Sequence, residues 1–142
     1  MNFSIAVCDD DMAMTQNLGE TIQIEFSKQN RVCEPHLFSD PRKLVEALAA
    51  TAFHMIFLDM DMPNLTGFDV AKDVVARHPQ TLIIFVTSHD ELVYPSLQYH
   101  PFRFIRKRFF HSEIEEEVSA GIISLEESGQ LIEVKTLSLI HI

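Results

Sequence analysis

The stretch MIFLDMDMPNLTG, residues 55–67, carries an apolar run that ends in a carboxylate. Four apolar residues, 55–58, precede Asp59, and the turn-forming residues Pro63 and Gly67 follow it. A short apolar run bounded by turn signals is typical of a buried strand. A single aspartate after a strand is more often a turn or cap residue, so the role of Asp59 depends on what the other strands carry at their ends.

Strand-like and helix-like segments alternate five times around this stretch. Apolar, β-branched runs predict strands at residues 3–8, 32–38, 53–59, 81–87 and 102–107, with Pro35 placing the second at an edge. Apolar residues at helical spacing and cap residues predict helices at residues 12–28, 39–50, 67–78 and 111–128. Repeated strand–helix units predict an α/β fold, in which helices cover both faces of a parallel sheet.

The expected fourth helix, residues 88–100, contains Pro95 in its middle. An interior proline costs a helix about 3 kcal/mol. We therefore expect this helix to be short, or broken near Tyr94.

The end of the chain lies outside the five-unit pattern. QLIEVKTLSLIHI, residues 130–142, has the composition of a new strand. We expect residues 1–128 to form one domain and residues 129–142 to be a linker or the start of a missing output domain. The final LSLIHI resembles translated sequencing adapter, so a non-native end stays open.

Composition favours a single cytoplasmic domain. The 142 residues fit one domain, and 46% of them are hydrophobic. The net charge of −10 argues against binding nucleic acid through bulk charge and fits cationic partners or metal ions. We expect Cys8 and Cys33 to be reduced core residues. The sequence shows neither a signal peptide nor an apolar run long enough for a membrane span.

The predicted strands end in residues that can work together. Ligands bind outside the carboxyl ends of the strands of open parallel sheets, and these ends carry Asp9 with Asp10, Asp59, Thr87 with Ser88, and Lys107. Carboxylates held close together need a cation, and an all-oxygen site suits Mg²⁺. A hydroxyl and a lysine beside it suit a phosphoryl group. Because a carboxylate can act as a nucleophile, Asp59 is the best candidate to form an aspartyl phosphate.

This combination resembles the response-regulator receiver domains (CheY-like) of bacterial two-component signalling. The resemblance covers about residues 2–128 and rests on the Asp9–Asp10 pair, LDMDMPNLTG (58–67), FVTS (85–88) and FRFIRK (102–107). It implies a doubly wound, flavodoxin-like (βα)5 three-layer sandwich with strand order 2-1-3-4-5. It also implies a signalling phosphoacceptor that catalyses only its own phosphotransfer and dephosphorylation.

The resemblance assigns a role to each matching residue. Asp59 would accept a phosphoryl group from a sensor histidine kinase. Mg²⁺ would be held directly by Asp10 and Asp59, mainly through water by Asp9, and by the backbone carbonyl of Asp61. Thr87 would hydrogen-bond the phosphoryl group and Lys107 would pair with it. Phe104 would be the switch aromatic that turns inward when Thr87 moves.

Residues 88–107 resemble, within the family, regulators that carry a LytTR DNA-binding domain, which implies control of transcription. The face formed by the fourth helix, fifth strand and fifth helix would transmit the signal, and a homodimer through it stays open. The family usually has proline after the lysine, often with a cis bond. Here Arg108 follows Lys107, so we expect a trans bond.

Other interpretations stay open. Arg103, Arg106 and Arg108 could form a nucleic-acid patch, a solvated edge strand, or a dimer face that pairs with the acidic last helix. Asp59 and Asp61 could be the D-x-D pair of a haloacid-dehalogenase-like phosphatase. The chain could also be a binding module that works without phosphorylation.

Overall fold

Five parallel strands form one sheet in the computed structural model, which describes residues 2–60, 62 and 65–141, with side chains up to residue 128. The strand order is β2-β1-β3-β4-β5, so the predicted doubly wound, flavodoxin-like α/β fold is confirmed. The strands are β1 (Asn2–Cys8), β2 (Val32–Phe38), β3 (Met55–Asp59), β4 (Leu82–Thr87) and β5 (Arg103–Arg106). As predicted from Pro35, β2 is an edge strand.

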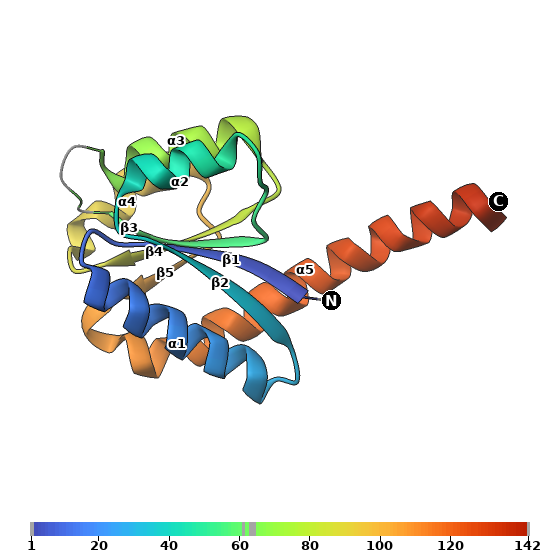
Figure 1. The fold of residues 1–142 in the computed structure, drawn as a ribbon, viewed down its shortest axis with the longest axis horizontal. Helices are drawn as coiled ribbons and strands as arrows, with labels where there is room; N and C mark the ends of the chain where they lie inside the picture. The colour runs from blue at the N-terminus through green and yellow to red at the C-terminus, as the bar shows by residue number, and fades with distance from the viewer. Residues whose placement is uncertain (1, 61, 63–64, 142) are drawn as a thin grey trace.

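Helices cover both faces of the sheet (Figure 1). One face carries α1 (Met12–Lys28) and the first part of α5 (Phe110–His141), and the other carries α2 (Pro41–Leu48) and α3 (Gly67–Arg77). Alternate residues of the central strands point to opposite faces of the sheet and pack into two hydrophobic cores, one on each face. Phe57 packs with the α1 and α5 side, whereas Ile56 and Leu58 pack with the α2 and α3 side. This period-two pattern is expected for a strand buried on both faces.

Side-chain caps fix the start of three helices close to the carboxyl edge of the sheet. Asp11 accepts hydrogen bonds from two backbone N–H groups in the first turn of α1, and Asp40 accepts one, from Arg42, at the start of α2. Thr66 and Asp69 form a capping box at α3. Because these caps satisfy backbone donors that lack a helical partner, they fix the residues at which α1, α2 and α3 begin.

The fourth helix is short and broken, as Pro95 predicted. It consists of the 3₁₀ turn η1 (Asp90–Leu92), the single turn α4 (Val93–Ser96) and the 3₁₀ turn η2 (Leu97–Tyr99). A further 3₁₀ turn, η3 (Lys107–Phe109), joins β5 to α5.

The prediction of a new strand after residue 129 is wrong, because α5 continues to His141. Figure 1 shows this part of α5 projecting away from the body of the protein. A strand there would leave its backbone groups unpaired, whereas a helix pairs them within the segment. Gly129 raises the free energy of the helix by only about 1 kcal/mol. Within the described residues, no helix has the length and apolar character to cross a membrane.

Candidate functional site

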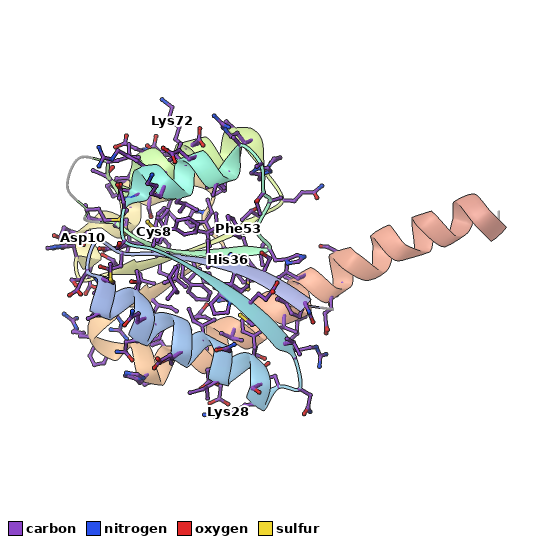
Figure 2. All side chains as sticks on the ribbon, in the orientation of Figure 1. Cys8, Asp10, Lys28, His36, Phe53 and Lys72 are labelled. Carbon is purple, nitrogen blue, oxygen red and sulfur yellow. The ribbon has the colours of Figure 1, made fainter. Side chains whose placement is uncertain are left out.

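The carboxyl ends of four strands surround one cavity. In the parallel register Cys8 lies opposite Leu58, and Asp59 lies opposite Val86, so the residues that follow these positions meet at one edge. The cavity has a volume of about 290 Å³ and is lined by Asp9, Asp10, Asp11, Met14, Asp59, Ser88, His89 and Lys107. Figure 2 shows Asp10 and Cys8 at this end of the sheet.

Three carboxylates converge in the cavity. Asp9, Asp10 and Asp59 each offer an oxygen, and these oxygens lie within 4.8 Å of one another. Asp9 and Asp59 are buried and Asp10 is exposed. Loss of part of its hydration in the cavity, together with the charge of Asp9, raises the pKa of the Asp10 carboxyl. A set of hard oxygen donors that repel one another fits a divalent cation such as Mg²⁺.

Lys107 supplies the positive charge at the other side of the cavity. Its Nζ lies 2.8 Å from Asp9 Oδ2 and 3.4 Å from Asp59 Oδ2. Burial alone would lower the pKa of this ammonium group, but the contacts with Asp9 and Asp59 outweigh burial and raise it. Lys107 is therefore charged at neutral pH and directed at the carboxylate predicted to react.

Thr87 and Phe104 lie on the neighbouring strands β4 and β5, and neither is among the described residues that line the cavity. Thr87 is buried at the end of β4, and its hydroxyl accepts the His89 N–H at 2.8 Å and donates to the His89 carbonyl at 3.1 Å. Phe104 is half-buried, and its ring stacks on Phe85 with centroids 5.9 Å apart. The Thr87 hydroxyl is thus hydrogen-bonded to the backbone of its own loop, while Ser88 and His89, which follow β4, line the cavity.

Some residues of the site differ from the expectation. Asp61, predicted to contribute its carbonyl, lies outside the described residues. His89 lines the cavity although the sequence had not singled it out, and its place just after the end of β4 is the signal that could have found it. Cys8 lies beside the acids, but burial and the charge of Asp59 raise the pKa of its thiol to about 12. It is therefore no nucleophile at neutral pH.

The basic segment around β5 is paired within the chain. Arg103 lies 3.4 Å from Glu117, Arg106 lies 2.8 Å from Glu113, and Arg108 lies 3.3 Å from Asp90. These pairs disfavour the nucleic-acid interpretation, because each guanidinium already has a carboxylate. The peptide bond before Arg108 is trans, since the described residues contain no cis bond.

Comparison with known proteins places the chain among signalling domains. The family model described as "Response regulator receiver domain" matches residues 5–119. The regulatory protein LuxO of Vibrio vulnificus is 37% identical over 51 residues, which cover 36% of this chain and 11% of LuxO. The DNA-binding transcriptional regulator NtrC of Escherichia coli is 27% identical over 95 residues, which cover 66% of this chain and 20% of NtrC. The chain thus spans only a small part of each of these relatives.

Solved structures share the same fold. The response regulatory domain of MrkE from Klebsiella pneumoniae has a TM-score of 0.77 and 21% identity, over 87% of this chain and 98% of that domain. At this identity the similarity shows the fold alone.

Proposed function

Because the chain belongs to the response regulator receiver domain family, we propose that Asp59 accepts a phosphoryl group from a phosphohistidine of a sensor histidine kinase. One observation carries the proposal: Asp59 is buried at the end of the central strand β3, within reach of Asp9, Asp10 and Lys107. The family match favours this function over that of a haloacid-dehalogenase-like phosphatase. It makes the chain a signalling phosphoacceptor module.

The chemistry is a single phosphoryl transfer. A carboxylate oxygen of Asp59 attacks the phosphorus, the nitrogen–phosphorus bond of the donor breaks, and the departing imidazole nitrogen takes up a proton. Lys107 stabilises the negative charge on the phosphoryl oxygens. Asp9, Asp10 and Asp59 would hold Mg²⁺, with the Asp61 carbonyl as a further ligand. When bound, this ion neutralises charge on the phosphoryl oxygens.

The phosphoryl group would then act on Thr87. The Thr87 hydroxyl leaves the His89 carbonyl and donates to a phosphoryl oxygen instead. This movement frees space beside β5, and the half-buried Phe104 turns inward. In this way the negative charge added at Asp59 would alter how α4, β5 and α5 pack against one another.

The output would be control of transcription through a LytTR-type DNA-binding domain. The support is the sequence of residues 88–107, together with the relative NtrC, which is named as a DNA-binding transcriptional regulator. Residues 1–128 would be the receiver, and residues 129–142 the link to that domain. Two buried, free cysteines fit the reducing cytoplasm. A homodimer through α4, β5 and α5 would use the exposed Tyr94 and Leu97.

Labelling with a small acyl phosphate tests the proposal. With Mg²⁺ present, we expect one phosphoryl group per chain by intact mass, and none after the metal is removed with a chelator. Asp59→Asn should abolish labelling, whereas the control Asp73→Asn, on α3 and outside the cavity lining, should keep it. Labelling that survives Asp59→Asn, or steady turnover of phosphate monoesters, would contradict the assignment.

A further inference from the structure

Two short segments that are far apart in the sequence both line the acidic cavity. The segment after β4 contributes Ser88 and His89, and the start of η3 contributes Lys107. A charged residue directly follows each of these lining segments in the sequence, Asp90 after His89 and Arg108 after Lys107. Arg108 Nη2 lies 3.3 Å from Asp90 Oδ2, so an ion pair joins the two segments next to the cavity.

The guanidinium of Arg108 is held in place by its neighbours. Its central carbon lies 5.1 Å from the centre of the Phe109 ring, and that of Arg106 lies 4.5 Å from the same ring. Glu113 binds the Arg106 guanidinium at 2.8 and 3.0 Å and accepts its backbone N–H at 2.8 Å. Lys107 therefore lies between two arginines that are anchored to different elements, Arg106 to α5 and Arg108 to η1.

We propose that Asp90 and Arg108 form a strap that holds the His89 segment against the Lys107 segment and restricts access of water to Asp59. Both are positioning residues, since neither lines the cavity. Proline, which the family usually has after the lysine, carries no guanidinium and could not make this contact. The strap is therefore a feature of this chain and is not expected in family members that have the proline. The inference rests on the proposed phosphoacceptor function and adds to it a determinant of the phosphorylated lifetime.

The step that the strap would slow is hydrolysis. A water oxygen attacks the phosphorus, the bond between phosphorus and the Asp59 oxygen breaks, and inorganic phosphate leaves with the proton passing to solvent. This step regenerates the Asp59 carboxylate. An exposed ion pair contributes little to overall stability, so loss of the strap should open the rim without unfolding the protein.

The test follows loss of the phosphoryl group from the full chain after the acyl phosphate is removed. We expect Asp90→Asn and Arg108→Gln each to lose it about two- to five-fold faster. The double variant should be no faster than either single variant, because both remove the same contact. Arg108→Lys keeps the charge and should stay close to wild type. Arg77→Gln, which breaks the ion pair with Asp73 on α3, serves as the matched control.

A second measurement does not depend on phosphorylation. Amide hydrogen exchange of residues 88–92 in the unphosphorylated protein should rise in both single variants, with the thermal midpoint unchanged. The strap would be overturned if the two substitutions had additive effects on the rate of phosphoryl loss in the double variant. It would also be overturned if both single variants showed wild-type amide exchange and lost the phosphoryl group at the wild-type rate. If the wild-type protein is never labelled at Asp59, the proposed function fails. The amide exchange measurement alone then decides whether Asp90 and Arg108 hold the two segments together.

Discussion

Gly67 lets the end of β3 and the start of α3 approach each other. A Cβ at this position would collide with the carbonyl oxygen of Asp59 and lie 2.7 Å from Met60 Cα. Both are backbone atoms, so no side-chain rotation can relieve the contact. The glycine therefore matters for the site through the backbone that carries Asp59, although it has no functional group.

Gly67→Ala should disturb both stability and labelling. Because the added methyl group has to displace the backbone of β3, we expect a loss of about 1–3 kcal/mol in the free energy of unfolding and slower phosphorylation of Asp59. Urea unfolding and the labelling rate measure the two effects. Gly121→Ala is the control: its Cβ would meet only the flexible tip of Met55 at 2.6 Å, and alanine favours the helix. Wild-type values for Gly67→Ala would contradict the argument.

His54 lies at the opposite edge of the sheet and gives a pH-dependent contribution to stability. Its Nδ1 accepts the Ser4 N–H at 2.9 Å, which requires the neutral ring. Burial lowers the pKa of this imidazole below its ordinary value of 6.5. The unfolded chain therefore binds more protons than the folded chain as the pH falls below that value, and the free energy of unfolding decreases.

His54→Asn should reduce this pH dependence. The amide oxygen of the substituted side chain can accept the Ser4 N–H, but the amide does not titrate. We therefore expect the free energy of unfolding to fall less between about pH 7 and about pH 5 in the variant than in wild type. Urea titrations at the two pH values measure the difference, and variants of surface histidines such as His111→Asn provide the control. If the free energy of unfolding fell equally with pH in wild type and in His54→Asn, His54 would not be the source of the pH dependence.

Four aromatic rings connect the proposed switch residue Phe104 to α3 and η2. Phe104 of β5 stacks on Phe85 of β4, and Phe85 contacts Phe68 of α3 at 6.0 Å. Phe68 in turn stacks on Tyr99 of η2 at 5.5 Å. An inward turn of Phe104 would therefore change the packing of rings on three other elements.

Tyrosine fluorescence can report this change, because the chain contains two tyrosines and no tryptophan. In Tyr94→Phe the remaining fluorophore is Tyr99, and we expect its emission to change when beryllofluoride and Mg²⁺ bind. In the matched variant Tyr99→Phe the remaining Tyr94 is 85% exposed, so we expect little change. Binding of beryllofluoride with unaltered Tyr99 emission would show that the rings are not coupled.

The sequence predicts correctly those elements whose residue spacing, cap residues or prolines indicate their bounds. The bounds of α1, the interruption at Pro95 and the meeting of Asp9, Asp59 and Lys107 all follow from spacing and from the shared edge of parallel strands. The pairing of Arg106 with Glu113 could not be predicted, because it depends on how α5 is rotated against β5. The helix after residue 129 was missed because strand propensity cannot show whether a partner strand exists.

Only the first part of α5 packs against the hydrophobic cores among the described side chains, although the helix continues to His141. The last side chain packed on either core among the described residues is Leu125. Beside it, Glu126 forms a two-pronged pair with Arg31, at 2.6 and 2.7 Å, which fixes α5 to the turn between α1 and β2. The fold and the site should therefore depend on α5 as far as Glu126 and not on the segment beyond Ser128.

Two truncations test this boundary. A chain that ends at Ser128 should keep the wild-type unfolding midpoint and the labelling of Asp59, because it retains both cores and the Arg31 pair. A chain that ends at Ser124 loses Leu125 and Glu126, and we expect its free energy of unfolding to fall by about 2 kcal/mol. Urea unfolding compares the two. A lower midpoint for the chain ending at Ser128 would show that the extended part of α5 stabilises the domain, and would move the domain boundary beyond residue 128.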